Sequence, residues 1–405
     1  MIRWIIFVAV VLVIDFYAFQ SLKTITKNKM AFAVYWLISL AILANFTYKL
    51  ATFDSAHGFP QDLMLAFGLL VLSIIPKFFA LLILFGEDVY RMTKSVFNYF
   101  SSTASTQFFP ERRTFVSKVA LGLAAIPFMS VLYGMARGKY NYQVINHTLY
   151  FNDLPEAFDG FKITHISDIH SGSFDDEEKI AEGINLINEQ ESDVILFTGD
   201  LVNNLAEEME PWIAHFSKLK AKLGKYSILG NHDYGEYVQF NSEEEKQQNF
   251  QAIKKLHPKI GFNLLLNNSV YVEKGNDKIA LVGVENWGTR FKKAGDLNVA
   301  SSKINKEDFK ILMSHDPSHW DAEIKNHPSN FHLILSGHTH GMQFGIEIPG
   351  IKWSPVQYIY KQWAGIYEES GKYINVNRGF GFLAFPGRVG IWPEITVITL
   401  KRKPV

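Results

Sequence analysis

Residues 331–341 read FHLILSGHTHG, and this stretch decides the fold. The apolar run at 333–335 stops at Ser336-Gly337, and His338 and His340 follow one residue apart. A buried strand that ends at a glycine and then presents imidazoles is typical of an α/β sheet with metal ligands at its carboxyl edge. The stretch therefore predicts a buried strand in such a sheet and a metal site at its end.

Four other apolar β-type runs end in the same kind of group. They cover 161–166, 194–198, 226–229 and 309–313. Each feature alone is weak evidence, because Asp-x-His arises by chance and Gly-Asp is a common turn, but five in order form a strong signal. Oxygen and imidazole ligands without sulfur suit Mn²⁺, Fe or Zn²⁺. The side chains that follow the five runs are Asp168, His170, Asp200, Asn231, His232, His315, His338 and His340.

Helical patterns lie between these runs, for example at 176–188 and 243–256. Strands that alternate with helices predict a largely parallel core sheet. The later β-type runs at 373–376 and 394–400 suggest a second sheet packed on it. We therefore predict an α/β domain over residues 161–401.

The first third of the chain is dominated by apolar runs. Each approaches or exceeds the roughly 18–20 residues that cross the hydrocarbon core of a bilayer. Buried core helices are the alternative, but four such runs in succession with short connections argue against it. We predict an all-α transmembrane region over 1–136, then a connector over 137–160. The four helices are expected at about 2–19, 30–48, 63–85 and 115–135.

The distribution of basic residues predicts the topology. Placing the first and third connections in the cytoplasm puts the N-terminus and the large domain outside it, in a multi-pass protein of the cell membrane. Arg112-Arg113 before the fourth run fits two interpretations, a twin-arginine-like export signal or ordinary cytoplasmic charge, and both give the same topology. The basic residues concerned are Lys23, Lys27, Lys29, Arg91, Lys94, Arg112 and Arg113.

Two ionisable residues, Asp15 and Lys77, fall within the predicted spans. Because unpaired charges in a membrane are expensive, we hypothesise that they approach each other across the first and third spans. Separate snorkelling to the interface is the alternative.

The composition excludes several functional classes. The formal net charge is zero, which argues against a nucleic-acid partner held by bulk electrostatics. The chain contains no cysteine, so disulfides, thiolate zinc sites and a cysteine nucleophile are all excluded.

The series SDIH (167–170), GD (199–200), GNHD (230–233), SHD (314–316) and GHTH (337–340) resembles the calcineurin-like metallophosphoesterase superfamily over about 162–400. The segments at 378–381 and 392–395 are similar to its membrane-associated, export-signal-bearing branch. The resemblance implies a four-layer α/β-β/α sandwich with two divalent metal ions, Mn²⁺ favoured. It implies that one metal is bound by Asp168, His170 and His340, the other by Asn231, His315 and His338, and that Asp200 bridges both.

The expected activity is hydrolysis of a phosphoric ester by attack of a metal-bound hydroxide. We expect His232 to protonate the leaving group. Asp233 is expected to orient His232 or to position another ligand, with a plain helix cap as the alternative.

A membrane anchor favours phosphodiester or lipid-linked phosphate substrates, because it keeps the site near the bilayer. Two other functions stay open. One is a lipid pyrophosphatase of lipid A synthesis, acting on a UDP-diacylglucosamine-type substrate, which would need a cytoplasmic site. The other is a non-catalytic metal-binding membrane receptor.

Overall fold

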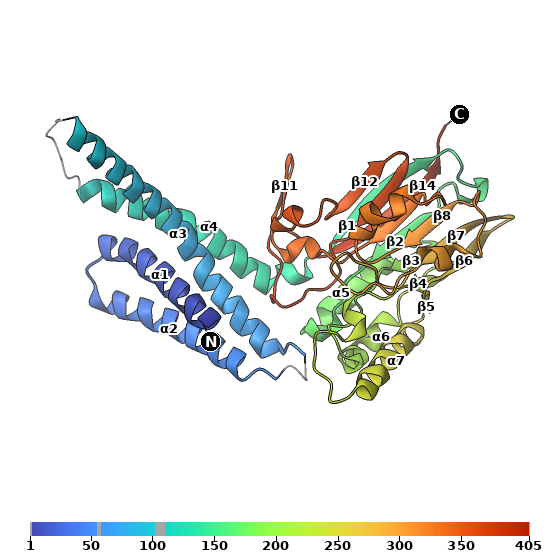
Figure 1. The fold of residues 1–405 in the computed structure, drawn as a ribbon, viewed down its shortest axis with the longest axis horizontal. Helices are drawn as coiled ribbons and strands as arrows, with labels where there is room; N and C mark the ends of the chain where they lie inside the picture. Colours follow the sequence, from blue (N-terminus) through green and yellow to red (C-terminus); the bar gives the residue numbers. More distant parts are fainter. Residues whose placement is uncertain (1, 55–57, 102–109, 405) are drawn as a thin grey trace. The chain divides into compact units, whose positions relative to one another are not determined.

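The computed structural model describes residues 2–54, 58–101 and 110–404 (Figure 1). The chain divides into two compact units. Unit 1 consists of Met1–Phe53 and Gln61–Met135, and unit 2 of Asp54–Pro60 and Ala136–Val405.

The described part of unit 1 consists of long apolar helices, as the sequence predicts. All four are long and apolar enough to cross a membrane. The third continues well past residue 85, because the charges that end the apolar run do not end the helix. The helices are α1 (Ile2–Ile25), α2 (Lys29–Ala51), α3 (Gln61–Phe100) and α4 (Pro110–Ala136).

The pairing of Asp15 with Lys77 is confirmed. Lys77 Nζ lies 2.5 Å from Asp15 Oδ1, which joins α1 to α3. Lys77 also donates to the hydroxyls of Ser39 and Ser73, each at 2.7 Å. Tyr35 on α2 donates to the backbone carbonyl of Asp15 at 2.8 Å. This polar network ties three apolar helices together.

We expect Lys77→Met alone to destabilise unit 1 by about 3–5 kcal/mol, because it leaves the buried Asp15 carboxylate without its counter-ion. The double variant Asp15→Leu/Lys77→Met should recover most of this loss, since no buried charge remains. The measurement is thermal unfolding of the detergent-solubilised chain, followed by its helical signal. Equal losses in the single and double variants would contradict the expectation.

Both residues of the Arg112-Arg113 pair form ion pairs with α3. Arg113 Nη1 lies 2.7 Å from Glu87 Oε2 and 2.6 Å from Asp88 Oδ1. Arg112 lies 3.5 Å from Glu87. These arginines therefore fix the start of α4 to α3 within unit 1.

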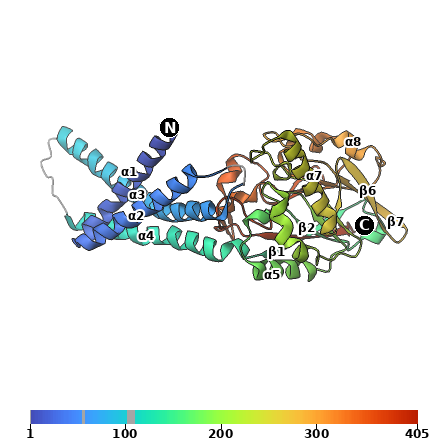
Figure 2. The same ribbon diagram turned by 90° about the horizontal axis from the view of Figure 1, so that it is seen from below.

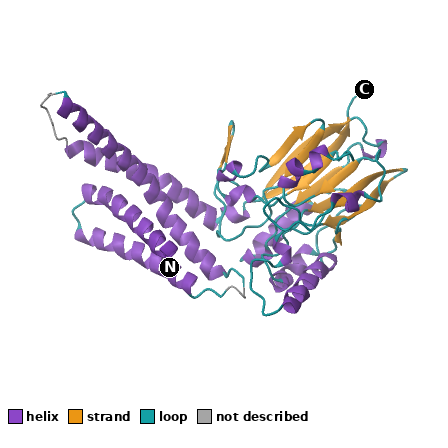
Figure 3. Ribbon diagram, in the orientation of Figure 1, coloured by secondary structure: helices purple, strands orange, loops and turns teal. Residues whose placement is uncertain are grey.

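The described part of unit 2 contains two six-stranded mixed sheets and one two-stranded hairpin (Figure 3). The first sheet has the order β1-β14-β2-β3-β4-β5, and the second has the order β12-β13-β9-β8-β7-β6. The first comprises β1 (Gln143–Phe151), β2 (Lys162–Ile166), β3 (Val194–Phe197), β4 (Lys225–Ser227), β5 (Asn263–Leu264) and β14 (Glu394–Arg402). The second comprises β6 (Asn268–Lys274), β7 (Asp277–Gly283), β8 (Lys310–Met313), β9 (Leu333–Ser336), β12 (Gly365–Glu369) and β13 (Lys372–Val376). The hairpin consists of β10 (Ile346–Ile348) and β11 (Ile351–Trp353).

The segment 137–160 is not a plain connector, contrary to the prediction. It contains β1, which pairs in parallel with β14 over its whole length, from Gln143 opposite Glu394 to Phe151 opposite Arg402. The partner strand is some 250 residues away in sequence, so only the folded sheet shows that this segment belongs to the domain.

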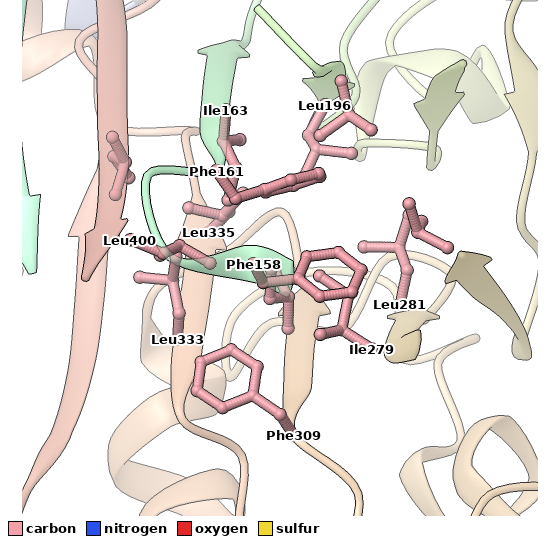
Figure 4. Close-up of a cluster of buried hydrophobic side chains, with 14 of the residues drawn as sticks. Phe158, Phe161, Ile163, Leu196, Ile279, Leu281, Phe309, Leu333, Leu335 and Leu400 are labelled. Carbon is pink, nitrogen blue, oxygen red and sulfur yellow. The ribbon is translucent and has the colours of Figure 1, made fainter. Parts of the chain in front are cut away.

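The main hydrophobic core fills the space between the two sheets (Figure 4). Ile163 and Leu196 come from the first sheet, and Leu281, Leu333 and Leu335 from the second; each is at most 1% exposed. Burial of each such side chain stabilises the fold by about 1.5–3 kcal/mol. On β9, Ile334 points to the other face and joins a second core. This is why the run at 333–335 is apolar at every position.

Helices cover the outer faces of the two sheets, as a four-layer sandwich requires. In Figure 2, α5 and α8 lie on opposite sides of unit 2. The second core joins Trp320 of α9 and Leu297 of α8 to the strands of the second sheet. The helices of unit 2 are α5 (Glu177–Asn188), α6 (Ile213–Phe216), α7 (Glu243–Lys259), α8 (Leu297–Ser301) and α9 (Ser318–Ala322).

Candidate metal centre

Five strand ends converge at one edge of the sandwich. β2, β3 and β4 are mutually parallel, as are β8 and β9, so their carboxyl ends meet. The sequence-predicted side chains all follow these ends. Those that are buried are Asp168, His170, Asp200, Asn231, His315 and His340, while His232 and His338 are partly exposed.

Two groups of candidate ligands meet at Asp200. Asp168, His170 and His340 form one group, and Asp200, His315 and His338 form another, with the ligand atoms of each group within 4.8 Å of one another. Asp200 Oδ2 lies 3.5 Å from His170 Nε2 and 3.1 Å from His315 Nε2, so one carboxylate oxygen faces both groups.

Asn231 and His232 lie beside these groups. Asn231 Oδ1 is 2.8 Å from His338 Nδ1, which places this amide oxygen beside the second group. A third set of candidate ligands, His170, Asp200 and His232, overlaps the first two.

The chemistry of the buried atoms fits divalent cations. The Nε2 atoms of His170, His315 and His340 are buried and form no hydrogen bond within the described part of the chain. A carboxylate oxygen nevertheless lies within 3.5 Å of each of them. Unpaired imidazole nitrogens facing carboxylates are the arrangement that a cation completes.

Carbonyl oxygens fix the tautomers of three histidines. Nδ1 of His315 lies 2.7 Å from the Thr198 carbonyl, and Nδ1 of His232 lies 2.7 Å from the Asn203 carbonyl. Nδ1 of His170 lies 3.1 Å from Asn203 Oδ1. Because a carbonyl oxygen only accepts, each Nδ1 carries a proton. His170 and His315 therefore offer the lone pair of Nε2 to the centre, while Nε2 of His232 is free to take up a second proton.

The backbone is strained where the candidate ligands lie. Positive φ values are rare for residues other than glycine and cost on the order of 1–3 kcal/mol each. The stability of the surrounding sheets must offset this strain. The turns at these positions direct the ligand side chains toward a common point. The candidate ligands with positive φ are Asp168 (52°), His170 (49°), Asp200 (59°), His338 (71°) and His340 (50°).

Gly337 allows two segments of backbone to pack closely, and it does not adopt the positive φ of a tight glycine turn. A Cβ at this position would collide with the hydroxyl of Ser167 and the carboxylate of Asp168. Its absence lets the backbone N–H of His338 donate to both oxygens of Asp168 at 3.0 Å. The glycine thus allows the opening motif to sit against the strand end that carries Asp168.

Buried charge favours cation binding at this edge. Burial raises the pKa of Asp200, but His315 and His232 outweigh it and hold that pKa well below its usual range. Burial lowers the pKa of His315, but the Asp200 carboxylate outweighs it and raises that pKa to about 10. A proton therefore balances the carboxylate when no metal is bound, and metal binding has to displace it.

The contacts of Asp233 support positioning and not direct catalysis. Its carboxylate accepts from the backbone N–H groups of Gly230 at 2.8 Å, Asp200 at 2.9 Å and Leu201 at 2.8 Å. Of the two positioning roles predicted for Asp233, the contacts favour the second. The His232 ring is held by the Asn203 carbonyl, and Asp233 holds the turn that carries the candidate ligand Asp200.

Several contacts with the centre were missed or underrated from sequence. Asn203 holds two histidines, His170 through its side-chain oxygen and His232 through its carbonyl. Tyr237 accepts from Asn231 Nδ2 at 2.9 Å, and the Tyr360 hydroxyl lies 2.9 Å from His338 Nε2. Buried Arg388 lies 3.1 Å from His340 Nδ1. No local motif marks these residues.

Two family descriptions match the chain. "Probable Calcineurin-like phosphoesterase, transmembrane domain" matches residues 2–139, and "Calcineurin-like phosphoesterase" matches residues 161–342. These comparisons give no evidence for a twin-arginine-like export signal at Arg112-Arg113.

Three relatives illustrate how far the similarity extends. The uncharacterized metallophosphoesterase YkuE of Bacillus subtilis is 32% identical over 66% of this chain and 90% of its own length. An uncharacterized metallophosphoesterase of Helicobacter pylori strain 26695 is 24% identical over 98% of both chains. The transmembrane protein with metallophosphoesterase domain of Danio rerio is 27% identical over 67% of this chain, which spans 60% of that protein. The chain is a membrane-associated member of the calcineurin-like metallophosphoesterase family.

Proposed function

We propose that this chain hydrolyses phosphoric esters, with phosphodiesters or lipid-linked phosphates as its preferred substrates and two divalent cations at the candidate centre. The observation that carries the proposal is the position of Asp200, whose Oδ2 faces both candidate ligand groups. When bound, two such cations would hold the phosphoryl oxygens and lower the pKa of a water between them. Mn²⁺ is the favoured ion, and Fe and Zn²⁺ suit the same ligands.

Residues of the chain would bind the cations, donate a proton and position the ligands. Asp168, His170 and His340 would hold one cation, and Asn231, His315 and His338 the other. His232 would hold a proton at Nε2 and give it to the departing oxygen, because its Nδ1 is already engaged by the Asn203 carbonyl. Asp233 would keep Asp200 in place through the backbone.

The preference for diesters or lipid-linked phosphates has two supports. Four candidate membrane spans hold the chain at a bilayer, where lipid phosphates are concentrated. Aromatic rings also border the centre. The ring centroids of Tyr237 and His232 lie 4.5 Å apart, and those of Phe291 and His338 lie 4.6 Å apart. Such rings would contact the organic group on either side of a diester. The comparisons do not favour the lipid A pyrophosphatase alternative.

The test uses the full chain in detergent with added Mn²⁺. We expect turnover of bis(4-nitrophenyl) phosphate to exceed that of 4-nitrophenyl phosphate and to vanish after metal removal. Restored activity after readdition of Mn²⁺ would exclude irreversible unfolding. Full metal content without turnover of either compound would support the receptor alternative and reject the proposal.

We further propose that unit 2 faces out of the cytoplasm. The support is the excess of basic residues at the first and third connections of the apolar helices. Protease added to intact spheroplasts should then degrade unit 2, while a cytoplasmic marker protein stays protected. Protection of unit 2 until the membrane is lysed would reverse the topology.

A further inference from the structure

The hairpin β10–β11 exposes apolar side chains that a surface hairpin ordinarily buries. Of the ten large apolar side chains exposed in the described part of unit 2, seven lie between Met342 and Ile359. Figure 1 shows β11 projecting from the rest of unit 2. Soluble domains rarely gather exposed apolar surface in one segment, so this patch marks a contact site. The hairpin patch consists of Met342, Ile346, Ile348, Ile351, Trp353, Tyr358 and Ile359.

The pairing register places the apolar side chains of the hairpin on one face. Ile346 lies opposite Trp353, and Ile348 lies opposite Ile351. Directly opposed residues of an antiparallel pair share a face, and so do residues two apart along a strand. These four side chains, each 39–55% exposed, therefore form one continuous apolar surface.

The other face of the hairpin is polar and is bound to the body of unit 2. Glu347 accepts from Arg378 Nη2 at 2.5 Å, and Arg378 is itself anchored by the buried carboxylate of Glu394. Lys352 Nζ donates to the carbonyl of Ala364 at 2.5 Å. The hairpin thus turns its polar side inward and its apolar side outward, the reverse of an ordinary surface hairpin.

We infer that the apolar face of β10–β11 rests in the interfacial region of a phospholipid bilayer. Tryptophan and tyrosine beside aliphatic side chains are the composition found at membrane interfaces, and Trp353 and Tyr358 supply them here. The chain also carries its own candidate membrane spans, which would keep unit 2 close to a bilayer. Unit 2 begins directly after α4, a candidate span that ends at Ala136.

The hairpin patch is joined to the candidate metal centre at both ends. It begins two residues after His340 and ends one residue before Tyr360, whose hydroxyl lies 2.9 Å from His338 Nε2. Ser354 Oγ donates to the carbonyl of Gly341 at 2.8 Å. Contact with the bilayer would therefore hold the centre near the headgroups, where a lipid-linked phosphate lies. Only this use of the contact rests on the proposed function.

The absence of cysteine allows the contact to be tested at single positions. The full chain with Ile348→Cys, labelled with an environment-sensitive fluorophore, is reconstituted in phosphatidylcholine–phosphatidylglycerol nanodiscs containing spin-labelled lipid. The matched control is Asn276→Cys, at the exposed polar turn of the β6–β7 hairpin in the same unit. We expect severalfold stronger quenching by the lipid spin label at position 348 than at position 276.

A second probe and a substrate comparison complete the test. Ile351→Cys should be quenched like Ile348→Cys, and unchanged melting temperatures show that both variants fold. Ile348→Ser/Ile351→Ser should hydrolyse soluble bis(4-nitrophenyl) phosphate normally but a lipid phosphodiester in nanodiscs more slowly. Quenching equal to that of the control at both positions would overturn the inference. It would mean that the patch does not touch lipid, as when a second copy of the chain or another protein covers it. Strong quenching without any turnover would support the bilayer contact and reject the proposed function instead.

Discussion

Replacement of Asp200 by asparagine is expected to remove both metal binding and hydrolysis. The substitution keeps the size of the side chain but deletes the charge that faces both ligand groups. Two bound cations contribute several kcal/mol of transition-state stabilisation, so the loss of turnover should be about 10³-fold or more. The measurements are metal content of the purified protein and turnover of bis(4-nitrophenyl) phosphate.

Asp193, at the opposite end of β3, provides a matched control. It precedes β3, whereas Asp200 follows it, and its carboxylate accepts from the backbone N–H of Lys162 at 2.8 Å. Asp193→Asn should retain both metals and full turnover. An Asp200→Asn protein that keeps its metal content and activity would refute the shared-carboxylate arrangement. The melting temperature of Asp200→Asn distinguishes two causes of lost activity. A marked decrease would indicate unfolding, whereas an unchanged value would indicate loss of the ions alone.

The candidate ligands could be predicted from sequence because each follows its strand directly. In a parallel sheet, the end of a strand fixes where the next side chains go, so local sequence already encodes their place at the edge. The pairing of Asp15 and Lys77 could be predicted for a different reason. An unpaired charge within a membrane span costs much free energy, and the predicted spans contain few ionisable residues that could pair with one another.

The supporting residues could not be predicted, because their contacts join distant parts of the chain. Arg388 reaches His340 across 48 residues, and the Asn203 carbonyl reaches His232 across 29. Local sequence predicts only a connector at 143–151, because the strand that pairs with this segment, β14, comes last in the domain. The role of Gly337 also became clear only from its packing against Ser167 and Asp168.

Replacement of His232 by glutamine is expected to make hydrolysis depend strongly on the leaving group. A general acid contributes about 10²–10⁴-fold when the departing oxygen needs a proton. An alkyl or unsubstituted phenyl leaving group needs that proton, whereas 4-nitrophenolate departs without one. The variant should therefore lose most activity toward a phenyl or alkyl diester and much less toward bis(4-nitrophenyl) phosphate, with its metal content unchanged.

The comparison of substrates separates the three roles open to His232. A loss that grows with the basicity of the leaving group identifies proton donation. An equal loss for every substrate, with both metals retained, would instead indicate that His232 binds the phosphoryl group. Loss of a metal would make it a ligand, which its position beside His170 and Asp200 also permits. His215→Gln on α6, where the ring pairs with Glu177 at 2.9 Å, is the control and should leave all substrates unaffected. Because these outcomes differ in pattern and not only in size, partial activity in the variant still decides among them.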